Sequence, residues 1–128
     1  MITGLNHITF AVSDLSKSVS FYTDVLGATV ENRWDAGAYL DLGGVWICLS
    51  LDAKAADQVR SDYSHIAFSV EAERLESFHA TFQANGVRIW KQNTSEGESI
   101  YFLDPDGHKL ELHVGSLQSR LASVNSRS

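Results

Sequence analysis

The chain of 128 residues has one cysteine, one proline and one methionine, and it has fewer basic than acidic residues. The lone Cys48 cannot form an internal disulfide, which suits a reducing cytoplasm. Because Pro105 is the single proline, the sequence contains no proline-rich linker to a second domain. No apolar run approaches the ~20 residues that span a bilayer, and the first residues carry no basic region or apolar core. We therefore expect a compact cytoplasmic domain without an export signal.

The charge balance narrows the class of ligand. Ten Lys and Arg against sixteen Asp and Glu give a formal net charge of −6. This balance argues against a protein that binds nucleic acid or an anionic membrane surface. A small anionic ligand would have to be bound by a few well-placed cations or by a metal ion.

The chain contains an internal repeat. Residues 7–12 (HITFAV) and 65–70 (HIAFSV) are identical at four of six positions. Helical spacing of apolar residues follows each run, at Leu15, Val19, Tyr22 and Leu26 and again at Leu75, Phe78 and Phe82. Further strands are predicted over 28–34, 38–42, 45–51, 87–91, 99–103 and 109–114. The predicted class is α+β, with two βαβββ repeats forming curved mixed sheets and helices on the outer face.

We expect these repeats to form a single domain. Its predicted extent is residues 1–122, with repeat one at about 4–52 and repeat two at about 62–115, and residues 123–128 form a polar C-terminal tail.

Three side chains form a candidate metal site. His7 and His65 head equivalent strands, and period-two alternation places His7 and Thr9 on the polar face of theirs. Glu111 projects from the polar face of the last strand, where the first repeat has Cys48. Two imidazoles and a carboxylate suit Mn, Fe(II) or Zn with open positions for water or substrate. A purely structural pair of strand histidines is the alternative interpretation.

Further polar and aromatic residues surround the same strands. Residues 93–99 are rich in oxygen donors and predict either a solvated loop or a cation site. Lys91, and Arg120 on a predicted terminal helix, could bind a phosphate or phosphonate near a metal, or could be ordinary surface residues. The aromatic set, either core or pocket wall, is Trp34, Tyr39, Trp46, Tyr63 and Trp90. His79 and His108 are expected to be surface or packing residues.

Several segments resemble the fosfomycin resistance glutathione transferases of the vicinal oxygen chelate superfamily, which also includes glyoxalase I and extradiol dioxygenases. The segments are 4–9 (GLNHIT), 34–40 (WDAGAYL), 49–51 (LSL), 90–93 (WKQN), 95–97 (SEG), 101–108 (YFLDPDGH) and 111–115 (ELHVG). The resemblance covers about residues 2–122. It implies a glyoxalase-like fold, a domain-swapped homodimer, and a Mn(II)-dependent, K⁺-activated enzyme. Such an enzyme inactivates the antibiotic fosfomycin by adding glutathione to its epoxide.

The resemblance also implies a role for each candidate residue. The metal would be bound by His7 of one subunit and by His65 and Glu111 of the other. The residues implied to bind substrate are Thr9, Trp46, Tyr63, Lys91, Ser95, Ser99, Tyr101 and Arg120. The potassium loop would comprise Asn93, Ser95, Glu96, Gly97 and Ser99. The glutathione channel would comprise Trp34, Tyr39 and Ser50. The residues implied to act in catalysis are Thr9 beside the oxirane, Tyr39 assisting the thiol, Lys91 and Arg120.

Two features depart from the family pattern, namely Ala36, where a polar residue is expected near the glutathione channel, and the polar tail 123–128. Both are expected to affect thiol binding more than metal binding. The alternatives are an epoxide hydrolase or a transferase using another thiol, then an Fe(II) extradiol dioxygenase, and then a metal-free drug-binding protein.

Overall fold

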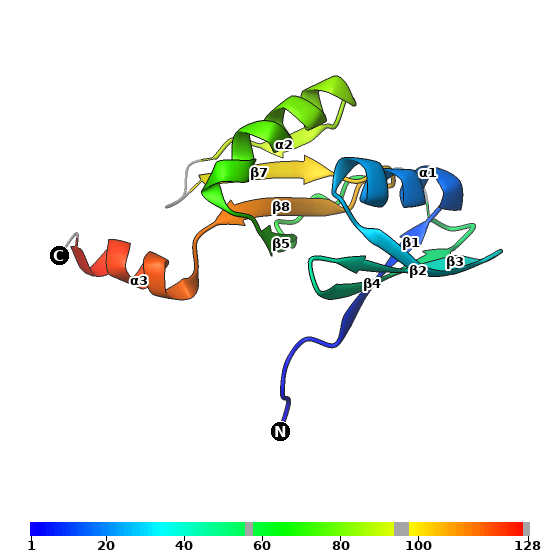
Figure 1. The fold of residues 1–128 in the computed structure, drawn as a ribbon, viewed down its shortest axis with the longest axis horizontal. Helices are drawn as coiled ribbons and strands as arrows, with labels where there is room; N and C mark the ends of the chain where they lie inside the picture. The colour runs from blue at the N-terminus through cyan, green and yellow to red at the C-terminus, as the bar shows by residue number, and fades with distance from the viewer. Residues whose placement is uncertain (56–57, 94–97, 127–128) are drawn as a thin grey trace. The chain divides into compact units, whose positions relative to one another are not determined.

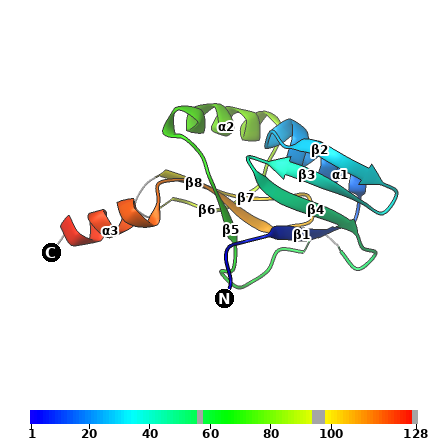
Figure 2. The ribbon, with the colours of Figure 1, turned by 60° about the horizontal axis from the view of Figure 1, so that its bottom comes forward.

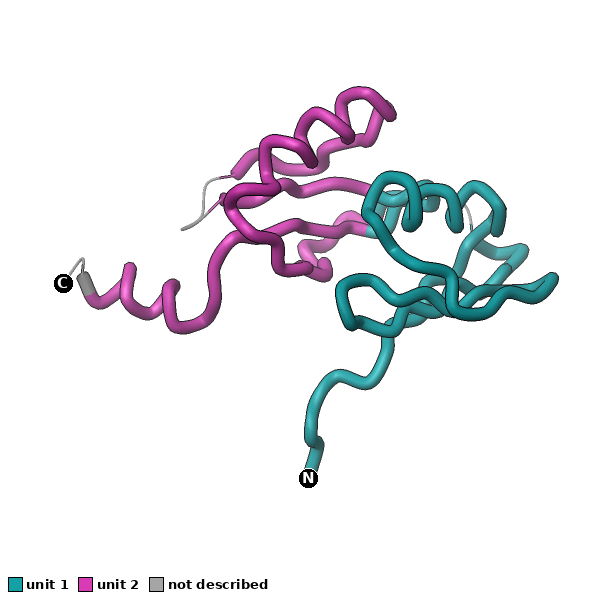
Figure 3. The backbone as a smooth tube through the Cα atoms, in the orientation of Figure 1, with its two compact units in different colours: residues 1–59, 104–108 teal, residues 60–103, 109–128 magenta. Residues whose placement is uncertain are grey.

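The computed structural model describes residues 1–55, 58–93 and 98–126 (Figure 1). The chain divides into two compact units, coloured separately in Figure 3. Unit 1 comprises Met1–Val59 and Asp104–His108, and unit 2 comprises Arg60–Leu103 and Lys109–Ser128. No helix among the described residues is both long enough and apolar enough to cross a membrane.

Unit 1 contains a four-stranded mixed sheet. Its elements are β1 (His7–Val12), α1 (Leu15–Ser20), the π-helical turn η1 (Phe21–Val25), β2 (Thr29–Trp34), β3 (Gly37–Leu42) and β4 (Val45–Leu51). The strand order is β1-β4-β3-β2, with β1 parallel to β4 and the other neighbours antiparallel (Figure 2). Along β1, Phe10 and Val12 are buried while His7 and Thr9 are exposed, so the predicted alternation is confirmed.

The helix of unit 1 begins where the sequence predicts. The Asp14 side chain caps α1 by accepting a hydrogen bond of 3.1 Å from the backbone N–H of Lys17. The buried faces of α1 and η1, including Leu15, Val19 and Tyr22, cover the apolar face of the sheet. This packing leaves the opposite face of the sheet, which carries His7, open.

The turn at residues 104–108 belongs to unit 1 because its polar groups bond there. Asp104 Oδ2 accepts a hydrogen bond of 2.8 Å from the Tyr22 hydroxyl, and Asp106 Oδ1 accepts one of 2.6 Å from the Ser13 hydroxyl. The ring of His108 lies with Nε2 2.9 Å from the carbonyl oxygen of Ala11, so of the two predicted alternatives, surface or packing, His108 is a packing residue. Burial raises the pKa of the Asp104 carboxyl, and it raises the pKa of Tyr22 well above its usual value.

Unit 2 repeats the same topology. Its elements are β5 (Ile66–Ser69), α2 (Ala72–Ala84), β6 (Ile89–Lys91), β7 (Glu98–Leu103), β8 (Lys109–Val114) and α3 (Leu117–Ser126). The strand order is β5-β8-β7-β6, with β5 parallel to β8. The helix α2 lies along this sheet (Figure 1), and Phe82 packs against Phe102 of β7 with ring centres 4.7 Å apart.

The predicted α+β class with two βαβββ repeats is therefore confirmed. Strands β4 and β8 have the predicted bounds. Strand β6 is shorter than the predicted 87–91, and its pairing with β7 shifts register between Ile89 and Lys91. The register shift disrupts the regular ladder at this edge of the sheet.

Candidate active site

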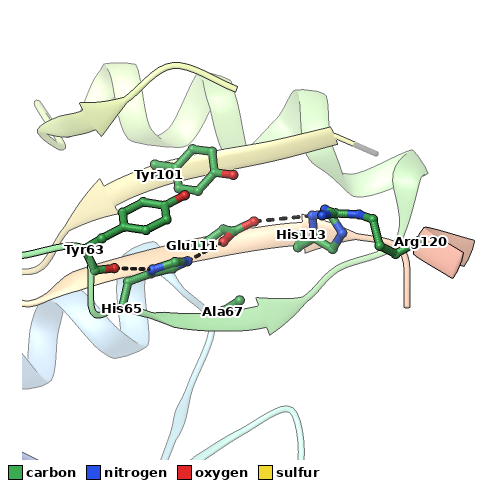
Figure 4. Close-up of a pocket in the computed structure, with 7 residues that line it drawn as sticks. All are labelled: Tyr63, His65, Ala67, Tyr101, Glu111, His113 and Arg120. Carbon is green, nitrogen blue, oxygen red and sulfur yellow. Dashed lines mark hydrogen bonds and ion pairs between the residues drawn. The ribbon is translucent and has the colours of Figure 1, made fainter. Parts of the chain in front are cut away.

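A pocket of about 290 Å³ opens on the sheet of unit 2 (Figure 4). Its lining residues are Tyr63, His65, Ala67, Tyr101, Glu111, His113 and Arg120. They come from the segment before β5, from β5, β7 and β8, and from α3, which carries Arg120 into the pocket. Five of the residues predicted from the sequence are thus brought together, and Ala67 and His113 join them.

His65 and Glu111 meet at the centre of this pocket. The Nε2 atom of His65 lies 2.9 Å from Oε1 of Glu111, and its Nδ1 atom lies 2.8 Å from the carbonyl oxygen of Tyr63. Since a carbonyl oxygen only accepts, Nδ1 carries the hydrogen, and Nε2 of a neutral ring turns its lone pair toward the carboxylate. Two acceptor atoms at this distance need a cation between them, which is either a proton or a metal ion.

The donor set fits a divalent metal. Two ligand atoms bound ~2.1 Å from one ion at a right angle lie ~3 Å apart, which is close to the 2.9 Å separation of His65 Nε2 and Glu111 Oε1. The hydrogen bond from Nδ1 to Tyr63 is the outer contact that usually orients a ligating imidazole. An imidazole with a carboxylate suits Mn, Fe or Zn.

The third predicted ligand belongs to the other unit. His7 heads β1 in unit 1, whereas His65 and Glu111 belong to unit 2. Within residues 1–55, 58–93 and 98–126, no group of three His, Cys, Asp or Glu side chains could hold a metal ion. The structure therefore joins two of the three predicted ligands.

The second carboxylate oxygen of Glu111 is also bonded. Glu111 is only 6% exposed, and its Oε2 accepts a hydrogen bond of 2.6 Å from the Ser99 hydroxyl. The Ser99 oxygen lies 2.6 Å from Nδ1 of His113, which is itself 3.3 Å from Glu111 Oε2. His113 has no role predicted from the sequence, although strand alternation places it on the same face as Glu111.

Lys91 lies between two tyrosines beside this pocket. Its ammonium donates to the Tyr63 hydroxyl and lies 4.6 Å from the Tyr63 ring centre and 4.7 Å from that of Tyr101. The hydrogen bond to Tyr63 raises the pKa of Lys91. Lys91 therefore stays positively charged at neutral pH.

A row of aromatic rings crosses the open face of the unit 1 sheet. The ring centres of His7 and Trp46 are 4.3 Å apart, those of Trp46 and Tyr39 5.3 Å, and those of Tyr39 and Trp34 4.8 Å. Trp34, Tyr39 and Trp46 are 41%, 37% and 41% exposed, so they are surface rather than core residues. The other residues predicted for this face, Thr9 on β1 and Ser50 on β4, are also exposed.

The predicted potassium loop is described only at its ends. Asn93 follows β6, and Ser99 is a buried residue of β7. Ser95, Glu96 and Gly97 lie outside the described residues.

Comparison with known proteins places the chain in a family. Residues 4–112 match the Glyoxalase/Bleomycin resistance protein/Dioxygenase superfamily, and the chain belongs to this superfamily. The chain is 55% identical over 130 residues to the glutathione transferase FosA of Serratia marcescens, with 99% of this chain and 92% of that relative covered. Within the superfamily it therefore belongs with the fosfomycin resistance proteins.

Two further relatives widen the comparison. The metallothiol transferase FosB of Staphylococcus saprophyticus is 42% identical over 125 residues, which cover 94% of this chain and 83% of FosB. A variant of the fosfomycin resistance protein FosX of Listeria monocytogenes superposes with a TM-score of 0.86 at 33% identity, covering 97% of this chain and 99% of FosX. That FosX structure is a complex with Mn(II) and 1S,2S-dihydroxypropylphosphonic acid.

Proposed function

We propose that the protein is a metal-dependent glutathione transferase that opens the epoxide of fosfomycin by thiolate attack and so inactivates the antibiotic. The observation that carries this proposal is the pairing of His65 Nε2 with Glu111 Oε1 at 2.9 Å in a pocket that Arg120 also lines. The 55% identity to a glutathione transferase favours glutathione as the thiol.

The proposed metal is one Mn²⁺ per site in a domain-swapped homodimer. His65 and Glu111 of one chain would hold it together with His7 of the partner subunit. Support comes from the pocket, where this chain supplies two ligand types that suit manganese, and from the Mn(II) in the related FosX complex. A metal bound there supplies a Lewis acid for the negative charge that develops on the epoxide oxygen.

The chain's own cations would bind the phosphonate of fosfomycin. Arg120 offers a guanidinium fork on the pocket wall, and Lys91 keeps its charge beside Tyr63 and Tyr101. The remaining groups proposed to bind this substrate are Ser95, Ser99, Trp46 and Thr9. Fixing the phosphonate would hold the electrophilic carbon in line for the thiolate, which lowers the entropic barrier. A local set of cations would thus allow a chain of net charge −6 to bind an anion.

The open aromatic face of unit 1 would hold glutathione. Trp34, Tyr39 and Ser50 lie exposed on this face and form the proposed channel. The Tyr39 hydroxyl would assist the thiol, and the charge of Lys91 would favour the thiolate, which is the nucleophilic form. The segment 93–99 would bind the activating K⁺. We propose that residues 1–122 act as one domain, in the cytoplasm, where glutathione is abundant.

The second candidate is a related enzyme that opens the same epoxide with water or with another thiol. The FosX complex favours it, because a dihydroxypropylphosphonic acid is the product expected when water opens an epoxypropylphosphonate. The FosB relative favours another thiol.

Product analysis separates these candidates. Purified protein would be incubated with Mn²⁺, K⁺ and fosfomycin in the presence of equal concentrations of glutathione and cysteine. We expect mass spectrometry to detect the glutathione adduct as the main product, and to detect none when the metal is removed by a chelator. A diol or a cysteine adduct without the glutathione adduct would overturn the proposal.

A further inference from the structure

Two buried polar groups, Ser99 and Glu111, and the partly buried His113 form a closed triangle next to the candidate metal site. Ser99 Oγ lies 2.6 Å from Glu111 Oε2 and 2.6 Å from His113 Nδ1, and His113 Nδ1 lies 3.3 Å from Glu111 Oε2. Ser99 is 7% exposed and Glu111 is 6% exposed. Groups this well buried must satisfy one another, since water cannot replace a lost partner.

The direction of each hydrogen bond follows from proton counting. An ionised carboxylate only accepts, so the Ser99 hydroxyl gives its single proton to Glu111 Oε2. The contact between Ser99 Oγ and His113 Nδ1 must then use the N–H of His113 as the donor. A hydroxyl whose proton is given to Glu111 cannot donate to a phosphonate at the same time.

We propose that His113 is a positioning residue that lets Ser99 change partners. When the Ser99 hydroxyl rotates to donate its proton to the phosphonate, Glu111 Oε2 loses that hydrogen bond. The Nδ1–H of His113, which already lies 3.3 Å from Oε2, then donates to it instead. The carboxylate then keeps a donor and its orientation in both states. This inference rests on the proposed function, because it takes Ser99 as a phosphonate ligand.

The backbone holds the His113 ring in the position that this exchange requires. His113 and Ser99 are direct partners across the antiparallel pair of β8 and β7. Gly115 has a φ of +139°, and a Cβ added there would lie 3.0 Å from Nε2 of His113. A glycine is therefore needed beside the ring. In unit 1 the equivalent cross-strand pair has Ser50 in place of His113 and Gly37 in place of Ser99. This pair therefore lacks the imidazole and the hydroxyl that meet in unit 2.

Metal affinity tests the triangle without any turnover. Mn²⁺ binding would be titrated for the wild type, Ser99→Ala, His113→Leu and the double variant. Either Ser99 or His113 can donate a hydrogen bond to Glu111 Oε2 when the other is removed. We therefore expect each single change to weaken Mn²⁺ binding less than about threefold and the double change to weaken it more than about tenfold. Effects that simply multiply would overturn the proposal.

Fosfomycin kinetics test the exchange itself. With His113→Leu, Ser99 stays on Glu111, so we expect the KM for fosfomycin to rise about tenfold, and to rise no further when His113→Leu is added to Ser99→Ala. His113→Asn, whose amide N–H lies near the Nδ1 position, should restore the KM to within about threefold. An unchanged KM in His113→Leu, or no rescue by His113→Asn, would overturn the inference.

Two controls keep the outcomes distinct. Thermal melting would verify that each variant folds, and His113→Gln, whose amide lies near Nε2 instead of Nδ1, would replace His113→Leu if the latter does not fold. A wild type that forms no glutathione adduct would contradict the proposed function, whereas multiplicative Mn²⁺ affinities would contradict the triangle.

Discussion

The two units share one backbone frame and carry different chemistry on it. In unit 1, Cys48 of β4 pairs with Thr9 of β1 and Tyr39 of β3. In unit 2, Glu111 of β8 pairs with Ala67 of β5 and Tyr101 of β7. The register therefore makes Cys48 equivalent to Glu111 and Tyr39 equivalent to Tyr101, as the sequence predicts for the first pair.

The equivalent faces differ in exposure and polarity. Tyr39 is 37% exposed in a row of aromatic rings, whereas Tyr101 is 3% exposed in a pocket where both carboxylate oxygens of Glu111 have a polar partner within 2.9 Å. The face of unit 1 carries the imidazole of His7 and a row of aromatic rings, whereas the pocket of unit 2 carries two imidazoles, a carboxylate and the guanidinium of Arg120. The two units thus share a topology but carry different site chemistry, so we propose that a complete site takes one unit of each kind from two chains.

Substituting the candidate metal ligand Glu111 should give the largest effect on Mn²⁺ affinity and activity. Glu111→Gln removes the carboxylate charge while keeping its shape, so we expect Mn²⁺ affinity and transferase activity each to fall more than about a hundredfold with the melting temperature little changed. The matched control is Cys48→Ser at the equivalent position of unit 1, which should leave Mn²⁺ affinity within about twofold. Glu111→Gln with wild-type affinity would remove Glu111 from the metal site.

The cation on α3 should give the next largest effect. Arg120→Lys keeps the charge but loses the planar fork, so we expect the KM for fosfomycin to rise about tenfold or more with a smaller change in kcat. Arg74→Lys on the exposed surface of α2 is the control and should change neither constant. Equal kinetics for both variants would contradict the role of Arg120.

The equivalent tyrosines should separate the two substrates. Tyr39→Phe removes a hydroxyl from the unit 1 face, and we expect kcat/KM for glutathione to fall about fivefold because the thiol loses an assisting group. Tyr101→Phe in unit 2 should instead raise the KM for fosfomycin by a similar factor. If both variants affect the same substrate, the proposed division between the two faces is wrong.

The smallest expected effect is on the titration of Lys91. The hydrogen bond to the Tyr63 hydroxyl raises the pKa of Lys91, so Tyr63→Phe should lower this pKa toward its ordinary value. A raised pKa keeps the lysine charged up to a higher pH. When Tyr63→Phe lowers the pKa of Lys91, any alkaline limb of the pH–activity profile that reports Lys91 should therefore move to lower pH. Isotope-detected NMR titration of the lysine side chain measures this, and an unmoved or higher pKa would contradict the assignment.

Much of the fold could be predicted because its signals are local. Period-two alternation predicted that His7 and Phe10 lie on opposite faces of β1, one exposed and one buried. The similarity between the strands that begin at His7 and His65 predicted the paired βαβββ topology. The hydrogen bond of Tyr22 to Asp104 spans 82 positions, and no local pattern predicts which side chain a buried aspartate will meet.

The candidate site was predictable in part for the same reason. The pairing of His65 with Glu111 follows from the repeat and from strand alternation, and the structure confirms that they lie together. His113 could have been placed beside Glu111 by alternation, but its bond to Ser99 depends on the register between β7 and β8. That register is a tertiary property, which sequence spacing alone does not set.

The most direct test of the divided site uses two inactive variants. His7→Ala and Glu111→Gln would be purified separately, mixed in equal amounts under conditions that exchange subunits, and assayed for the glutathione adduct, with native mass spectrometry to verify mixed dimers. If His7 acts with the partner's His65 and Glu111, each mixed dimer has one intact site, so activity should return to about a quarter of the wild-type value. Mixed dimers that remain inactive would contradict a metal site shared between two chains.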